Sequence, residues 1–168
     1  IYNCFIFITI KSRTYFFYVI YVTMFALWQL TLVGFYYQYI SSDSVLSMQT
    51  ISNFLVISIW SMCHFTRDFL NLKQTRPRID WAVKFASFIY LALFVLGFFV
   101  PLFIWLKMIV GAVSTCAVLL MVTAILRVKQ GSIEARYYTI ALFSFFFGGI
   151  LLALRNLGVL PSIFITDY

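Results

Sequence analysis

The chain has 168 residues, of which 64% are hydrophobic and 10% are charged. Soluble globular domains carry about 25% charged residues, so this composition excludes an ordinary soluble domain and is typical of a membrane protein. In a soluble protein the formal net charge of +7 would suggest a nucleic-acid partner. Here the basic residues lie in short segments beside long apolar runs, so we expect the lipid bilayer as a partner and no nucleic acid.

Long apolar runs along the chain predict transmembrane helices, because the strands of a membrane barrel instead alternate apolar and polar residues over about 10 positions. We expect an all-α fold, a polytopic helical membrane bundle that forms a single domain. It has a partial first span and five complete spans, and the last span of a seven-helix unit is missing. In chain order, the predicted spans are 1–10 (partial), 15–39, 49–70, 81–100, 102–127 and 136–156.

The basic residues predict the orientation of these spans, because Lys and Arg accumulate in cytoplasmic loops. The loops expected on the cytoplasmic side are 11–13, 67–84 and 127–136. Those expected on the extracytoplasmic side are 40–48, 97–102 and 157–168. We therefore expect a multi-pass protein of the inner (cytoplasmic) cell membrane. Trp81 and Trp105 are expected near opposite membrane interfaces, where tryptophan is enriched.

The predicted third span carries several polar and aromatic side chains, here called the polar stripe. Their spacings of seven, four, three and four residues place them within roughly 60° of one helix face. The polar stripe consists of Asn53, Trp60, His64, Arg67 and Asn71. One interpretation is a coupling element that ends at the inner face of the membrane. The other, more frequent for such side chains, is interhelical hydrogen bonding, worth about 0.6 kcal/mol per pair on average.

Two pairs of small residues lie on the last predicted span, each pair separated by one helical turn. The pairs are Ser144 with Gly148, and Gly149 with Ala153. Small residues at this spacing allow two helices to approach closely. A homodimer contact and packing within one chain fit this pattern equally well.

No catalytic constellation can be recognised in the sequence. The five acidic residues all lie away from the predicted membrane centre, whereas proton- or ion-coupled carriers keep an ionisable group there. Cys63 and His64 are adjacent, but zinc needs three or four ligands and the sequence places no others beside them. We therefore expect no catalytic residues, no cofactor and no metal site, and the chain itself is not expected to be an enzyme.

Three parts of the chain together resemble the bacterial seven-transmembrane receptors with diverse intracellular signalling modules. The first comprises Tyr2-Asn3, the segment Arg13–Tyr18, Gly34 and Gln38-Tyr39. The second comprises Phe65–Leu70 followed by Arg76–Asp80, and the third is Leu154–Pro161. These segments are similar to the passage between the first two helices of that family, the end of its third helix, and the stretch after its sixth helix.

The resemblance implies a sensor. Members of the family usually carry an extracytoplasmic domain that binds carbohydrates or similar small molecules. After the seventh helix they carry a cytoplasmic signalling module, such as a histidine kinase or a diguanylate cyclase. We expect both domains to lie outside this chain, so the expected function is to relay an outer signal to an output module. The alternative is a segment of a small-molecule transporter or channel, for which residues Asn53 to Arg67 are the candidate polar pathway.

Overall fold

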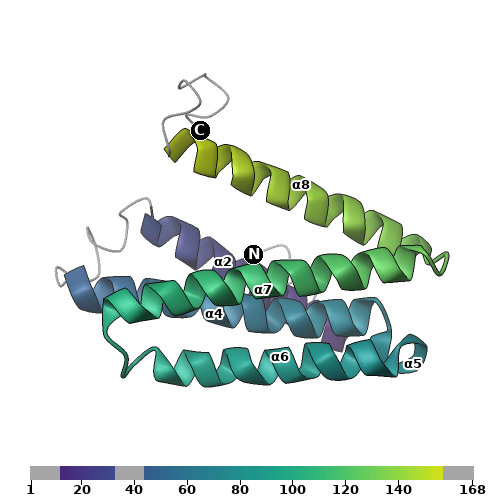
Figure 1. Ribbon diagram of the computed structural model, residues 1–168, viewed down its shortest axis with the longest axis horizontal. Helices are drawn as coiled ribbons and strands as arrows, with labels where there is room; N and C mark the ends of the chain where they lie inside the picture. Colours follow the sequence, from purple (N-terminus) through teal and green to yellow (C-terminus); the bar gives the residue numbers. More distant parts are fainter. Residues whose placement is uncertain (1–11, 33–43, 157–168) are drawn as a thin grey trace. The chain divides into compact units, whose positions relative to one another are not determined.

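The structure is a computed structural model that describes the backbone of residues 12–32 and 44–156, and the side chains of residues 12–30 and 52–148. Within these residues it contains six helices and no strand, which confirms the all-α prediction (Figure 1). The helices are α2 (Arg13–Leu32), α4 (Ser44–Phe69), α5 (Leu72–Thr75), α6 (Pro77–Leu96), α7 (Leu102–Val128) and α8 (Ile133–Asn156).

The observed helices differ from the predicted spans mainly because they extend into segments that were predicted to be loops. Helix α7 ends within one residue of its predicted span, but α4 begins at Ser44, so part of the predicted loop 40–48 is helical. Helix α6 runs from Pro77 to Leu96 rather than over 81–100. Proline favours the first turn of a helix because its missing N–H needs no partner there. The predicted cytoplasmic loop 67–84 therefore contains the end of α4, all of α5 and the start of α6.

Two helices in the described part of the chain are long and apolar enough to cross a membrane, namely α6 and α7. The prediction of five complete spans is not supported by this criterion. Helices α2 and α4 contain tyrosine, tryptophan and several hydroxyl or amide side chains, which lower their average hydropathy. The predicted partial span 1–10 and the loop 157–168 lie outside the described residues.

The chain divides into two compact units, residues 1–120 and 121–168, with the boundary inside α7. In the first unit, α4 contacts both α2 and α6, and the short α5 packs on α4 and α6. One face of α4 is buried at alternating spacings of four and three residues, which is the pattern of closely packed membrane and coiled-coil helices. This face comprises Ser52, Val56, Ile59, Cys63, Thr66 and Leu70. Helix α4 is therefore the central helix of the first unit.

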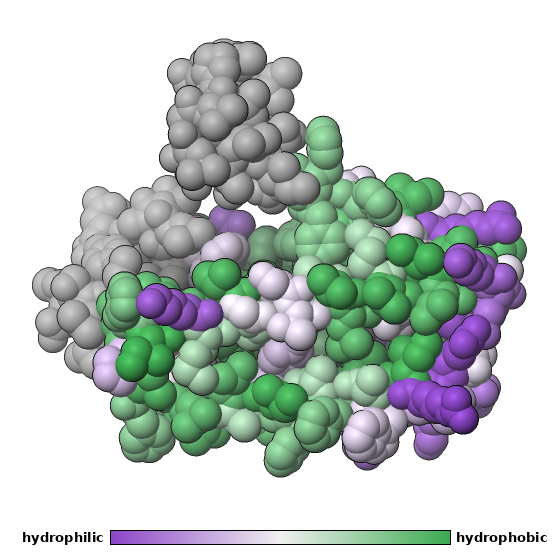
Figure 2. Space-filling view, in the orientation of Figure 1, coloured by the Kyte–Doolittle hydropathy of each residue, from purple (hydrophilic) through white to green (hydrophobic). Residues whose placement is uncertain are grey.

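Large apolar side chains cover the outside of α6 and the beginning of α7. Trp81, Phe88, Phe99 and Phe103 are all exposed, and hydrophobic residues spread over most of the visible face of the first unit (Figure 2). Hydrophilic residues of this unit gather at the end where α5 lies. A soluble monomer rarely exposes so large an apolar area, so this distribution fits a helix surface that contacts lipid.

The second unit contains the end of α7 and helix α8, joined by a tight turn. Gly131 has a φ of 82°, in the left-handed region that glycine adopts without steric cost. Ser132 precedes α8 and caps it, because its Oγ accepts a hydrogen bond of 3.3 Å from the Ala135 N–H. The Ser132 hydroxyl also donates to Glu134 Oε2 at 2.8 Å, which lowers the pKa of Glu134 below its ordinary value.

Candidate functional site

The most prominent polar contact in the first unit joins α4 to α6. Arg67, in the last turn of α4, donates from Nη2 to Asp80 Oδ2 at 3.0 Å and from Nε to Asp80 Oδ1. Asp80 lies in the first turn of α6, where a carboxylate is also favoured by the helix dipole. Only 16% of the Arg67 side chain and 13% of the Asp80 side chain are exposed. This two-pronged, mostly buried ion pair fixes both the distance and the orientation of the two helix ends.

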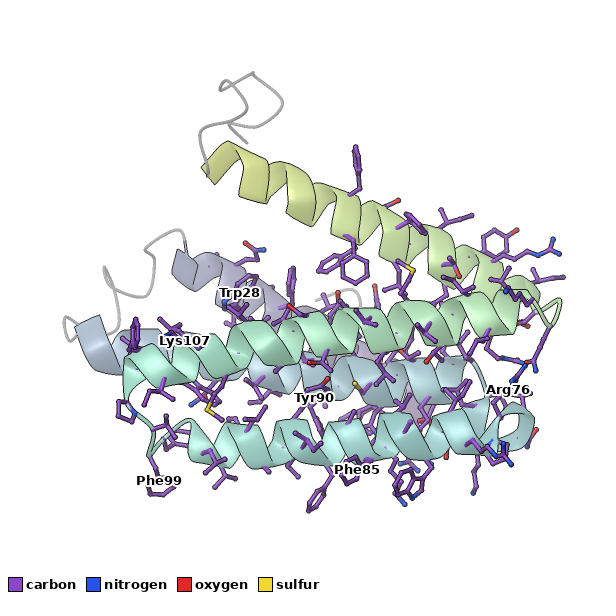
Figure 3. The ribbon with its side chains drawn as sticks, viewed as in Figure 1. Trp28, Arg76, Phe85, Tyr90, Phe99 and Lys107 are labelled. Carbon is purple, nitrogen blue, oxygen red and sulfur yellow. The ribbon has the colours of Figure 1, made fainter. Side chains whose placement is uncertain are left out.

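The turn between α4 and α6 brings this ion pair together. Asn71 has φ 47° and ψ 47°, a left-handed conformation that asparagine tolerates better than most residues. It reverses the chain after α4, and its Nδ2 donates to Gln74 Oε1 at 2.9 Å. Helix α5 follows, and Arg76 donates its backbone N–H to Leu72 O at 2.9 Å. Arg76 marks this end of the unit in Figure 3.

Helix α2 is fixed to α4 by an aromatic cluster beside a second ion pair. The Phe17 ring stacks on His64 with centroids 4.7 Å apart. Trp60 meets the same two rings edge-on, at 5.8 and 4.8 Å. Arg13 Nε lies 3.5 Å from Asp68 Oδ2, and its guanidinium carbon is 5.7 Å from the Phe17 centroid. Since Arg13 is exposed, this second pair is expected to contribute little to stability.

In the first half of α4, the buried amide of Asn53 meets the turn between α6 and α7. A Cβ added at Gly97 would lie 2.4 Å from Asn53 Oδ1 and 2.6 Å from Trp105 Cζ2, so only glycine fits between these two side chains. Asn53 Oδ1 and Trp105 Nε1 are buried and have no hydrogen-bond partner among the described residues. The glycine therefore allows three helices to meet at one point.

The polar stripe is thus divided among different neighbours. Asn53 meets the α6–α7 turn, Trp60 and His64 meet α2, and Arg67 pairs with α6. Asn71 lies beyond the end of α4, so the regular helical rotation that placed it on the same face does not extend to it. The four residues on α4 flank its buried face rather than forming that face.

Some features of the site were not predicted from the sequence. Asp80 was counted among the acidic residues but not recognised as the partner of Arg67. An acidic residue just after the proline that starts a helix is a usable signal, because carboxylates are favoured in the first turn. The Trp105 side chain is fully buried inside the protein, whereas Trp81 is 67% exposed, and the position of both residues near the membrane interfaces stays a prediction. The space beside Gly97 accounts for this burial.

The predicted small-residue pairs lie on α8. Ser144 and Gly148 are exposed, and a Cβ added at Gly148 would meet nothing within 4 Å. Gly149 and Ala153 lie outside the residues whose side chains the structure describes. The close-packing prediction for these pairs therefore stays a prediction.

Chemically, the site holds helices together rather than presenting a set of reactive groups. Among the described residues, no group of three or more His, Cys, Asp or Glu side chains is placed to hold a metal ion. The contacts are instead ion pairs, ring contacts and one buried amide, all converging on α4. Such contacts can be exchanged when helices shift, so they are suited to distinguishing two helix arrangements.

Comparison with known proteins gives one match. A protein-family model described as 7TM diverse intracellular signalling matches residues 1–168, which is the whole chain and agrees with the resemblance noted in the sequence. No curated protein and no solved structure matches.

Proposed function

We propose, because the chain belongs to the 7TM diverse intracellular signalling family, that it is the membrane region of a sensor that relays an extracytoplasmic signal to a cytoplasmic output module. The family match over residues 1–168 is the observation that carries this proposal. The signal is a small molecule such as a carbohydrate, recognised by a domain outside this region. The output module is attached in the same polypeptide and supplies any enzymatic activity.

We further propose that α4 is the relay element. It is the helix that contacts both α2 and α6, and it is held at two separate points, by Arg67–Asp80 in its last turn and by Asn53 beside Gly97 in its first half. A helix held at two separate points transmits a displacement as a rigid body, since a packed core resists continuous deformation. A signal then needs only to stabilise one of two helix arrangements relative to the other.

The alternative function, a transporter or channel segment, requires a continuous polar pathway. The polar stripe was its candidate. Trp60 and His64 are in contact with the Phe17 ring, and Arg67 is engaged by Asp80. These side chains contact two different partners, Phe17 of α2 and Asp80 of α6, instead of facing one common space, so the observations favour the relay.

The proposed orientation can be tested with an impermeant thiol reagent. We propose that all the predicted spans cross an inner membrane, with the turn containing Phe99 outside and the turn containing Gln74 inside. Both residues are exposed in the structure, and Phe99 marks its turn in Figure 3. In intact cells, Phe99→Cys is expected to react while Gln74→Cys reacts only after permeabilisation. Labelling of Gln74→Cys in intact cells would contradict the orientation.

The relay role of α4 can be tested in the full-length protein through the activity of its output module. Arg67→Ala is expected to change the basal output about tenfold, because a difference of about 1.4 kcal/mol in the stability of the ion pair between two states changes their ratio by that factor. Arg67→Lys keeps the positive charge but cannot donate two parallel hydrogen bonds to the Asp80 carboxylate, so we expect an intermediate change in basal output. Arg78→Ala, at an exposed position of α6, is the matched control. Normal membrane insertion with unchanged output in Arg67→Ala would refute the relay role.

A further inference from the structure

Two cysteines from different helices meet in the interior of the first unit. Cys63 belongs to the buried face of α4, and Cys116 lies on the part of α7 that belongs to the same unit. Their Sγ atoms are 3.8 Å apart, and their side chains are 0% and 4% exposed. Both are free thiols. Nothing in the proposed relay uses these thiols, although one of them belongs to α4 itself.

We propose that Cys63 and Cys116 form a site of oxidative modification, at which a small membrane-permeant peroxide joins α4 to α7 by a disulfide bond. A disulfide holds its sulfur atoms about 2.05 Å apart, so the two sulfur atoms must approach by about 1.8 Å. The site takes an uncharged oxidant because both thiols are buried, and a charged reagent would lose its hydration on reaching them.

The chemistry needs one peroxide molecule for each disulfide. One sulfur attacks a peroxide oxygen and the O–O bond breaks, which gives a sulfenic acid and, after proton transfer from the thiol, one water or alcohol molecule. The other thiol then attacks the sulfenic sulfur, the S–O bond breaks, and the departing hydroxide takes the thiol proton as water. Overall the two sulfurs lose two electrons and two protons, and the peroxide is reduced.

The geometry favours the disulfide over further oxidation. A sulfenic acid formed on either cysteine is already in contact with the second thiol, as the 3.8 Å separation shows. Formation of sulfinic acid would require a second peroxide molecule to reach the same buried sulfur. The resolving step is intramolecular, so it is faster than that second encounter.

The consequence for signalling rests on the proposed function. If α4 moves relative to its neighbours during relay, a covalent bond to α7 holds one arrangement and removes the response to ligand. The bond itself does not depend on that function. Its formation is measured chemically, so a disulfide without any effect on output would contradict the relay through α4 and leave the modification site intact.

The test uses the full-length protein in membrane vesicles, with Cys4→Ala to remove the third cysteine of this region and hydrogen peroxide as the probe. After treatment the protein is denatured, free thiols are alkylated, and peptides are identified by mass spectrometry. We expect a peptide pair that joins Cys63 to Cys116 and separates on addition of dithiothreitol. Alkylation of both cysteines after treatment, or their recovery as sulfinic acids without any linked peptide, would overturn the proposal.

A matched variant tests whether contact between the thiols matters. Cys116→Ala combined with Ala112→Cys moves the thiol of α7 by one helical turn to another buried position, about 6 Å away along the helix. We expect the linked peptide to form about tenfold more slowly or not at all in this variant, because its sulfurs start outside bonding reach. Equal rates in the two proteins would show that the link forms through general mobility, which also overturns the proposal.

Discussion

Replacing Asp80 with alanine is expected to lower the free energy of unfolding by about 3 kcal/mol, the lower end of the range for breaking a buried ion pair from one side. The change leaves the Arg67 guanidinium charged and mostly buried, with only 16% of its side chain exposed. The free energy of unfolding falls because the buried guanidinium remains desolvated, and the Asp80 carboxylate is no longer there to compensate for this cost. It can be measured by reversible unfolding of the protein in detergent micelles, followed by circular dichroism.

Asp68→Ala provides a matched comparison, because Asp68 follows Arg67 directly in the last turn of α4. Asp68 pairs with the exposed Arg13 at 3.5 Å, and exposed pairs typically contribute about 0.2–1 kcal/mol. Exchanging the charges in Arg67→Asp with Asp80→Arg should recover part of the stability lost in Asp80→Ala. If Asp80→Ala and Asp68→Ala reduce the free energy of unfolding by the same small amount, the ion pair does not fix α4 to α6.

The helix bounds could be predicted from the sequence where proline and basic residues mark a helix end clearly, and less well where they do not. Helix α7 was predicted within one residue at its end, because Pro101 precedes it and a basic residue, Arg127, falls in its last turn. Helix α6 was placed four residues too late, because Pro77 lies in a basic segment that was interpreted as a loop. The local charge was used to predict the membrane side of that segment, and that side stays a prediction. The charge gave no information on where the backbone becomes helical.

The candidate site was predicted less completely, for a different physical reason. The polar stripe could be found because the spacing of side chains on one helix is fixed by its geometry. The partners of those side chains depend on the turn at Asn71 and on the register between helices. Neither the Arg67–Asp80 pair nor the contact of Cys63 with Cys116 follows from spacing within one segment. Trp105 shows the same limit, because its burial requires the absence of a side chain at Gly97, in the turn that precedes α7.

The contacts of α4 also explain why polar side chains near its buried face need not form a pathway. Small residues such as Ser58 and Ser61 on this helix satisfy their hydroxyls with nearby backbone carbonyls, at 3.4 Å to Tyr21 O and 2.6 Å to Ile57 O. These hydroxyls are therefore already hydrogen-bonded to backbone carbonyls of α2 and α4. What distinguishes Arg67 and Asn53 is that each contacts a neighbour outside the pair α2 and α4: Arg67 meets the start of α6, and Asn53 meets the turn between α6 and α7.

Gly97→Ala is expected to destabilise the protein by about 1–3 kcal/mol, the usual cost of overpacking a well-packed site. The backbone at Gly97, with φ −59° and ψ −18°, is ordinary, so alanine causes no strain there and would by itself reduce the entropy of the unfolded chain. The steric term is larger. The new Cβ would lie 2.6 Å from the fully buried Trp105 ring, which cannot move without displacing α7. Unfolding in detergent micelles measures the effect.

Gly111→Ala serves as the control, because a Cβ at this position in α7 meets nothing within 4 Å. A helical glycine replaced by alanine at an open position gains about 0.5–1 kcal/mol, so the two substitutions should change stability in opposite directions. Asn53→Ala removes the other close atom, so combining it with Gly97→Ala should cost less than the sum of the two single changes. Additive effects would mean that Asn53 does not approach Gly97. They would then refute the proposed contact between α4 and the α6–α7 turn.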